Sequence, residues 1–178
     1  VKYQDEVPIE IGDFARAIEQ VMSGRLQSLM FEPGRLIVAN AGVLLTTVNT
    51  LKYNDEKSFA VVDAAMNDLI RPALYNAWQE VTPVSLKDDV ASIEKTWDIV
   101  GPVCETGDFL AKDRVLSLKE GDLLAILSAG AYGFVMSSNY NSRPRSAEVL
   151  VSGQKHYCIR KRETIEDLFA LESIKPFS

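Results

Sequence analysis

The chain opens with apolar residues at the spacing of an amphipathic helix. Between residues 9 and 22 they recur three or four positions apart, which predicts a helix. Gly24 suits its end, because glycine tolerates the backbone conformation that closes helices. The mostly apolar run 26–31 predicts a short buried strand that leads into a turn at 32–35. We expect residues 1–35 to be the closing unit of an α/β layer.

From residue 36 the pattern changes to short apolar runs rich in β-branched residues, separated by Gly, Asp, Asn and Pro clusters. These predicted strands lie in VLLTTVNTLKY, SFAVVDAAM, WDIVGPV, FLAKDRVLSL, DLLAILSAGAYGF and EVLVSGQKHYCIRK. NDEK, between the first two, reads as a hairpin turn. Strands at this spacing are typical of an antiparallel sandwich or barrel. We expect the class α+β, mainly β, with a β-sandwich of Greek-key type over residues 36–178.

Two short helices interrupt this strand pattern. DLIRPALYNAW predicts a helical piece with Asp68 as its N-cap. ETIEDLFALES predicts a closing amphipathic helix, with Thr164 as N-cap and Asp167 at the third helical position.

Composition argues against several classes of protein. The apolar fraction is 47% and the formal net charge is −6, which is too acidic for a general nucleic-acid binder. No apolar run approaches the roughly 18 residues of a membrane span. Two cysteines are too few for a disulfide framework, and one histidine makes a metal site unfavourable. We expect a cytoplasmic protein with reduced thiols, no metal, and no nucleic-acid or membrane partner.

Two segments offer groups for binding anions. In Glu32-Pro33-Gly34-Arg35, a Pro-Gly turn with a positive φ at Gly34 would aim successive N–H groups at an anion, and Arg35 would add a cation. The alternative is a loop with a solvated arginine. Arg71 and Tyr75 lie four residues apart on one helical face, where both could meet a carboxylate. The alternative is that Tyr75 packs in the core and Arg71 pairs with a local acid such as Asp68.

Two further loops carry candidate chemistry. Cys104 and Glu105 precede a glycine turn, where a thiol and a carboxylate could reach one cleft. The alternative is a small buried cysteine beside a solvated glutamate. Small residues around Tyr132 would let a ligand or backbone approach its ring, or would mark a corner of the sheet. His156 is expected on the surface, and Cys158 is expected to be a strand residue without a role.

Four motifs taken in order resemble one family. EPGR, DAAMND followed by RPALY, GPVCETGD and GAYGF resemble the carboxy-terminal part of the diaminopimelate decarboxylases. These belong to the fold type III amino-acid decarboxylases that depend on pyridoxal 5'-phosphate (PLP), with ornithine and arginine decarboxylases as siblings. The resemblance implies that residues 1–35 are the last segment of a PLP-binding (β/α)₈ barrel. It also implies a homodimer in which the Cys104–Glu105 loop of one subunit enters the site of the other.

The resemblance also implies residue roles. Cys104 would be the proton donor. Cofactor contacts would come from Glu32, Gly34, Arg35 and Tyr132. Substrate contacts would come from Arg35, Arg71, Tyr75, Glu105 and Tyr132. Two arginines suit a substrate with two carboxylates, which favours meso-2,6-diaminopimelate, converted to L-lysine and CO₂.

The same resemblance indicates what this chain would lack. The Schiff-base lysine, the cofactor-facing histidine and the Gly-rich phosphate loop of the family would lie upstream of residue 1. We therefore expect a fragment that neither holds PLP covalently nor turns over substrate alone, and that associates with its missing barrel. Two alternatives stay open: a sibling decarboxylase of the ornithine or arginine type, and a non-catalytic sandwich module that dimerises or regulates a partner.

Overall fold

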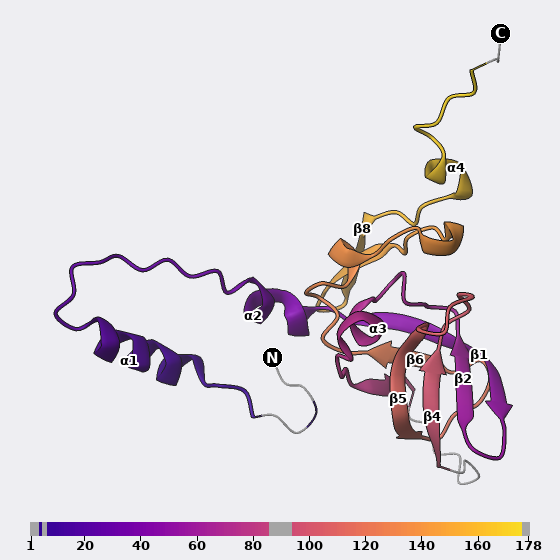
Figure 1. The fold of residues 1–178 in the computed structure, drawn as a ribbon, viewed down its shortest axis with the longest axis horizontal. Coiled ribbons are helices and arrows are strands. Elements are labelled where there is room, and N and C mark those ends of the chain that lie inside the picture. The colour runs from indigo at the N-terminus through magenta and orange to yellow at the C-terminus, as the bar shows by residue number, and fades with distance from the viewer. Residues whose placement is uncertain (1–3, 5–6, 86–93, 176–178) are drawn as a thin grey trace.

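The computed structural model describes residues 4, 7–85 and 94–175 of the 178-residue chain. The helices are α1 (Ile11–Met22), α2 (Gly34–Val38), α3 (Arg71–Tyr75) and α4 (Ile165–Leu168), with 3₁₀ helices η1 (Ala39–Ala41), η2 (Phe134–Met136) and η3 (Tyr140–Ser142). The strands are β1 (Leu44–Tyr53), β2 (Ser58–Val62), β3 (Val81–Pro83), β4 (Lys95–Val100), β5 (Phe109–Leu116), β6 (Leu123–Ile126), β7 (Glu148–Ser152) and β8 (Lys155–Arg160). Figure 1 shows how these elements are arranged.

Six strands form one sheet in the order β3-β6-β1-β2-β4-β5, and β7 and β8 form a separate hairpin. The edge strands β3 and β5 contact each other, so the larger sheet curls almost into a barrel. This confirms the predicted class, α+β and mainly β. The expectation of purely antiparallel pairing is wrong for β2 and β4, which run parallel. The connection between them is long and includes α3 and β3, as a parallel pair requires.

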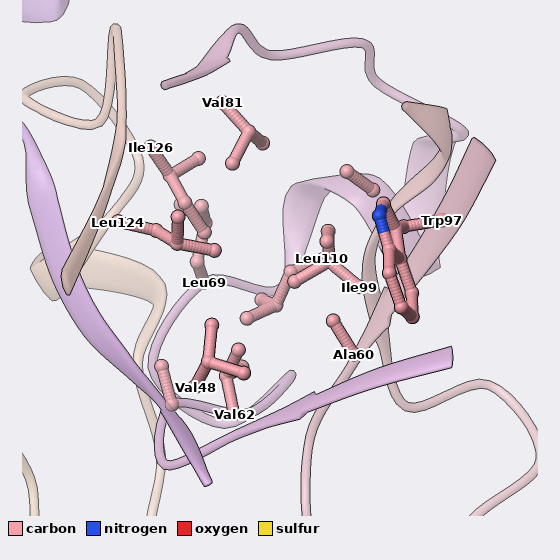
Figure 2. Close-up of a cluster of buried hydrophobic side chains, with 12 residues drawn as sticks. Val48, Ala60, Val62, Leu69, Val81, Trp97, Ile99, Leu110, Leu124 and Ile126 are labelled. Atoms are coloured by element: carbon pink, nitrogen blue, oxygen red, sulfur yellow. The ribbon is translucent and has the colours of Figure 1, made fainter. Parts of the chain in front are cut away.

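The core lies inside the curled sheet, where side chains from most of its strands meet (Figure 2). Trp97 of β4 is almost completely buried, and its indole Nε1 donates to the carbonyl of Leu116 at 2.9 Å. Leu69, in the loop that leads to α3, is fully buried in the same cluster. Burying such a leucine stabilises a fold by about 1.5–3 kcal/mol. The start of α3 is therefore anchored in the core.

The N-terminal segment extends away from the sheet (Figure 1, indigo). α1 lies within the predicted helix, and Gly24 follows its end with φ of 75°. The predicted strand at 26–31 is wrong, because those residues form no regular element and are exposed. A strand needs a neighbouring strand for its N–H and C=O groups, and none of the described strands pairs with this segment. α1 itself has no buried residue.

The predicted tight turn at Gly34 is also wrong. Pro33 occupies the N-cap, α2 begins at Gly34, and Gly34 does not have a positive φ. The amide of Ile37 donates to the carbonyl of Pro33 at 3.3 Å. Proline is favoured at helix starts, so the same letters also signal a helix. The predicted division of the chain after residue 35 falls within α2 and stays a prediction.

Most of the predicted strands are present, with two changes of extent. The NDEK turn closes the β1–β2 hairpin, where the amide of Asn54 donates to the carbonyl of Lys57 at 3.0 Å. β6 ends at Ile126, well before the end of the predicted run. The last predicted run is two strands, because Gly153 turns the chain with φ of 58°.

Of the two predicted helix caps, the one on α4 is confirmed and the one on α3 is wrong. Thr164 and Asp167 form the predicted capping box on α4, which ends at Leu168. Asp68 does not cap α3, since the N-cap is Ile70. The carboxylate of Asp68 instead accepts the amide of Ala65 at 3.0 Å, within the preceding turn.

Candidate active site

Arg71 and Tyr75 of α3 gather with Tyr132, which lies far from them in the chain. The guanidinium carbon of Arg71 lies 5.6 Å from the centroid of the Tyr75 ring and 5.2 Å from that of Tyr132. These distances are within the range of cation–π attraction. Tyr75 and Tyr132 are 59% and 42% exposed, so the cluster faces outward. A guanidinium there can bind a carboxylate with two parallel hydrogen bonds.

The alternative reading of α3 does not hold. Tyr75 is exposed and does not pack in the core. Asp68 faces Arg143, whose Nη2 lies 3.7 Å from Asp68 Oδ2. The guanidinium of Arg71 instead lies near the rings of Tyr75 and Tyr132, and its role in binding a ligand stays a prediction.

The loop that carries Tyr132 is held against the segment that follows α2. The amide of Gly130 donates to the carbonyl of Ala39 at 3.0 Å, and the amide of Ala129 donates to the carbonyl of Gly42 at 2.9 Å. A Cβ atom on Gly130 would lie 1.9 Å from the carbonyl oxygen of Val38, so only glycine fits there. These contacts therefore fix the loop of Tyr132 against the end of α2 and the residues that follow it.

Tyr132 has a left-handed backbone, with φ of 59°. Such a conformation is unusual for a bulky residue, and backbone strain of this kind clusters at functional sites. Here it accompanies the placement of the Tyr132 ring beside Arg71.

The start of α2 has the groups that a phosphate needs. Glu32 and Arg35 are exposed, and a Cβ on Gly34 would meet nothing within 4 Å. The first amides of a helix have no intrahelical acceptor, and Arg35 adds a positive charge beside them. Backbone amides at an open glycine together with a guanidinium fit the phosphate group of PLP. Glu32 can contribute through its backbone, since its carboxylate would repel a phosphate.

Cys104 and Glu105 are both exposed at the tip of a loop between β4 and β5. Cys104 is a free thiol rather than a buried residue. The chain turns back at once, because the amide of Asp108 donates to the carbonyl of Glu105 at 3.0 Å. The predicted presentation of a thiol beside a carboxylate before a glycine turn agrees with this geometry.

The base of this loop is held by a buried carboxylate. Asp108 is 4% exposed and accepts the amides of Met66 and Val103, each at 2.7 Å. Burial raises the pKa of Asp108, although both hydrogen bonds oppose the rise. A Cβ on Gly101 would lie 2.5 Å from Asp108 Oδ2, so a glycine is needed there. Asp108 thus ties the Cys104–Glu105 loop to the turn that precedes α3.

The described chain therefore presents two groups of candidate residues. One contains Arg71, Tyr75 and Tyr132, and the other contains Cys104 and Glu105. His156 and Cys158 lie exposed on β8, as predicted for a surface histidine and a strand cysteine. Within residues 4, 7–85 and 94–175, no cluster of three or more His, Cys, Asp or Glu could hold a metal. No helix of that part is long and apolar enough to cross a bilayer.

Comparison with known families decides the relationship. Residues 13–130 match the model of the pyridoxal-dependent decarboxylase C-terminal sheet domain. This chain belongs to that family. The fold of a pyridoxal-dependent decarboxylase sheet domain accounts for the curled sheet, and the resemblance inferred from the four motifs is confirmed.

Individual members of the family are similar over nearly the whole chain. A diaminopimelate decarboxylase of Pseudomonas fluorescens is 61% identical over 176 residues, which cover 99% of this chain and 42% of that protein. A crystal structure from Aquifex aeolicus matches with a TM-score of 0.90 and 46% identity, over 96% of this chain and 42% of the other. The crystal structure of diaminopimelate decarboxylase from Helicobacter pylori complexed with L-lysine matches with a TM-score of 0.87 and 42% identity. The match again covers 96% of this chain and 42% of the other. The chain thus spans less than half the length of these decarboxylases.

The structure also shows residues near the candidate site that the sequence analysis did not predict. Tyr140 donates its hydroxyl to Glu105 Oε2 at 3.3 Å. Arg143 donates to the side chain of Asn67 and to the carbonyl of Asp63. The only sequence signal was a cluster of Asn, Ser and Arg between two predicted strands, which is typical of any loop.

Proposed function

We propose that this chain is the C-terminal part of a PLP-dependent decarboxylase that converts meso-2,6-diaminopimelate to L-lysine and CO₂. The observation that carries the proposal is the cluster in which the guanidinium of Arg71 lies near the exposed rings of Tyr75 and Tyr132. The named functions of the similar proteins agree with it. The active enzyme would include the barrel that the family resemblance implies, since this chain covers only 42% of the length of these relatives.

The choice of substrate rests on charge. Diaminopimelate carries two carboxylates and two amino groups. Arg71 binds one carboxylate through its fork of N–H groups, and Arg35 binds the other. Glu105 accepts hydrogen bonds from the distal amino group, while the phenol of Tyr75 adds a donor beside Arg71. An amino acid without a distal carboxylate would leave one arginine without a partner.

PLP would be held by groups at the start of α2 and by the Tyr132 loop. The amides of Gly34 and Arg35, with the backbone of Glu32, would bind its phosphate, and the Tyr132 ring would lie against cofactor and substrate. When bound, PLP withdraws electrons from the bonds of the substrate α-carbon. The residues of this chain orient the bond that breaks and hold the anions in place.

Cys104 returns the proton after CO₂ leaves. The thiol S–H transfers its proton to the α-carbon, and the electron pair left by the broken C–C bond forms the new C–H bond there. The thiolate then regains a proton from solvent. An exposed, unpaired thiol at a loop tip is suited to this exchange.

We also propose a cytoplasmic homodimer with shared sites. The loop of Cys104 and Glu105 would serve the partner's cluster of Arg71, Tyr75 and Tyr132. The exposure of both groups and their separate surroundings support this arrangement. The unpaired state of Cys104 and Cys158 supports a reducing compartment.

The test uses the whole enzyme that contains this segment, with meso-diaminopimelate as substrate and L-lysine release as the measurement. The variant Arg71→Ala should raise KM by at least about tenfold, because a charged hydrogen-bonded pair contributes roughly 1.5–3 kcal/mol. Lys155→Ala, at an exposed position at the start of β8 and outside the N-terminal segment, is the control and should leave KM unchanged. An unchanged KM for Arg71→Ala would remove its assigned role. A wild-type enzyme that decarboxylates ornithine or arginine instead would belong to a sibling activity.

A further inference from the structure

A third loop, residues 138–143, lies against Glu105. The hydroxyl of Tyr140 donates to Glu105 Oε2 at 3.3 Å. Tyr140 is 45% exposed, so its ring lies at the surface with the carboxylate that it contacts. Neither the motifs in the sequence nor the proposed chemistry uses this residue.

Buried groups fix the position of the loop. Asn67, 2% exposed, exchanges hydrogen bonds with Ser138: the amide of Ser138 donates to the carbonyl of Asn67 at 2.9 Å, and Asn67 Nδ2 donates to the carbonyl of Ser138 at 3.2 Å. At the other end of the loop, Arg143 Nε donates to Asn67 Oδ1 at 2.9 Å and Nη2 donates to the carbonyl of Asp63 at 2.6 Å. Both ends of the loop are thus bound to the segment that leads to α3.

Because these contacts fix the backbone around Tyr140, its hydroxyl can hold the flexible side chain of Glu105 in one position. A glutamate has several rotamers, and ordering it costs conformational entropy when it binds a ligand. A hydrogen bond from a residue whose own backbone is tied down restricts the carboxylate before the ligand arrives. Oε1 accepts the amide of Gly107 at the long distance of 3.5 Å, so it stays available to a ligand.

We propose that Tyr140 is a positioning residue that orients the Glu105 carboxylate toward the distal amino group of the substrate. This rests on the proposed function, in which Glu105 binds that group. The negative charge of Glu105, together with the hydrogen bond between them, raises the pKa of Tyr140. The phenol therefore keeps its proton and remains a donor to the carboxylate.

The experiment compares the whole enzyme with its Tyr140→Phe variant, which loses one hydroxyl and keeps the ring. L-Lysine, the product, retains the distal amino group, so its dissociation constant can be measured by calorimetry without turnover. We expect this constant and the KM for meso-diaminopimelate each to rise about fivefold, the factor that an ordinary net hydrogen bond corresponds to. We expect kcat to change by less than about twofold, because Tyr140 acts on binding and not on the reacting carbon.

Tyr53→Phe is the matched control. Tyr53 lies at the end of β1, and its ring packs edge-on against Trp97 with 5.4 Å between centroids. Removal of its hydroxyl should leave L-lysine binding, KM and kcat unchanged. An equal loss of affinity in both variants would overturn the inference, since the effect would then not be specific to Glu105.

A second variant tests whether the loop acts through Tyr140. Arg143→Lys keeps the charge near Asp68 but loses the fork that reaches both Asn67 and Asp63. It should also weaken L-lysine binding, and Tyr140→Phe added to it should cause little further loss. Fully additive losses in the double variant would overturn the coupling of Arg143 to Tyr140.

The outcomes separate this inference from the proposed function. A wild-type enzyme that decarboxylates meso-diaminopimelate, with a Tyr140→Phe variant that binds L-lysine equally well, overturns the positioning role alone. A wild-type enzyme that neither binds L-lysine nor releases it overturns both.

Discussion

At the scale of single residues, buried carboxylates hold the loops of the candidate site. Asp68 and Asp108 have raised pKa values because burial disfavours their charged forms more than their hydrogen bonds favour them. Each therefore lowers stability as the pH rises from the ordinary aspartate value through its own raised pKa. Asp63 has the opposite balance. Burial would raise its pKa, but hydrogen bonds from Thr46 and Thr47 together hold the pKa below its usual value.

The variant Asp63→Asn should change how stability responds to acid. Both hydrogen bonds, from the Thr46 hydroxyl at 2.6 Å and the Thr47 amide at 2.8 Å, end on Oδ1, which asparagine also provides. The stability from the Asp63 charge is fully present above the ordinary value of 3.8 and is lost as the pH falls through the lowered pKa. The variant should be less stable at pH 7, and the difference should shrink below about pH 4.

Urea denaturation of the wild-type chain and the variant at a series of pH values measures this difference. Asp55→Asn, in the exposed β1–β2 turn, is the control and should follow the wild type throughout. A gap between Asp63→Asn and wild type that stays constant or widens toward acid would show that the Asp63 charge does not stabilise the fold.

Sequence reasoning named some candidate site residues and missed others for a physical reason. Helical spacing made Arg71 and Tyr75 candidates and the small residues around Tyr132 made it another, but only the family resemblance gave these residues their predicted roles. Asn67 and Arg143 act across 76 positions of sequence, through a hydrogen bond from Nε to an amide oxygen. Nothing in the local pattern of either residue specifies such a partner, so their role needed the fold.

At the scale of elements, the successes and failures follow from how much each element depends on distant partners. The β1–β2 hairpin is local, and its turn residues predict it. The apolar run 26–31 has the composition of a strand. A strand, however, needs a neighbouring strand to pair with, and the composition of the run does not show whether one is present. β6 stops at Ile126, and the following Ser128 has a left-handed φ of 56°, which an apolar run does not reveal.

The contact between the Tyr132 loop and the segment after α2 makes a sharp test. Gly130→Ala would place a Cβ 1.9 Å from the Val38 carbonyl oxygen and 2.9 Å from the Gly42 nitrogen. Since both atoms are backbone, one segment must move. We expect a loss of at least about 1–3 kcal/mol in the free energy of unfolding, measured by urea denaturation.

Gly107→Ala is the control for this substitution. Its Cβ would meet nothing closer than Glu105 Cγ at 4.0 Å, and Gly107 does not have a positive φ. It should change stability by no more than about 0.5 kcal/mol. If Gly130→Ala is tolerated equally well, the close approach that fixes Tyr132 beside Arg71 does not exist in solution.

At the scale of the whole molecule, a well-packed sheet and an uncovered N-terminal segment contrast sharply (Figure 1). The curled sheet buries its core residues almost completely. The N-terminal segment exposes a series of large apolar side chains that includes Ile11, Phe14, Leu26, Met30 and Ile37. Apolar surface gathered in this way marks an interaction face or an aggregation hazard. In the proposed enzyme, the barrel covers it.

This contrast predicts that the 178-residue chain alone associates through its N-terminal segment. Sedimentation velocity over a range of concentrations should show dimers or larger species, because burying apolar area stabilises association by roughly 25 cal/mol per Å². Replacing Leu26 and Met30 by serine should shift the distribution toward monomer. The same change at Val149 and Val151, exposed on the β7 strand, serves as the control and should shift it less.

A wild-type chain that sediments as a monomer at every concentration would show that the segment does not act as an interaction face. A larger shift from the β7 variant would instead place the associating surface on the β7–β8 hairpin.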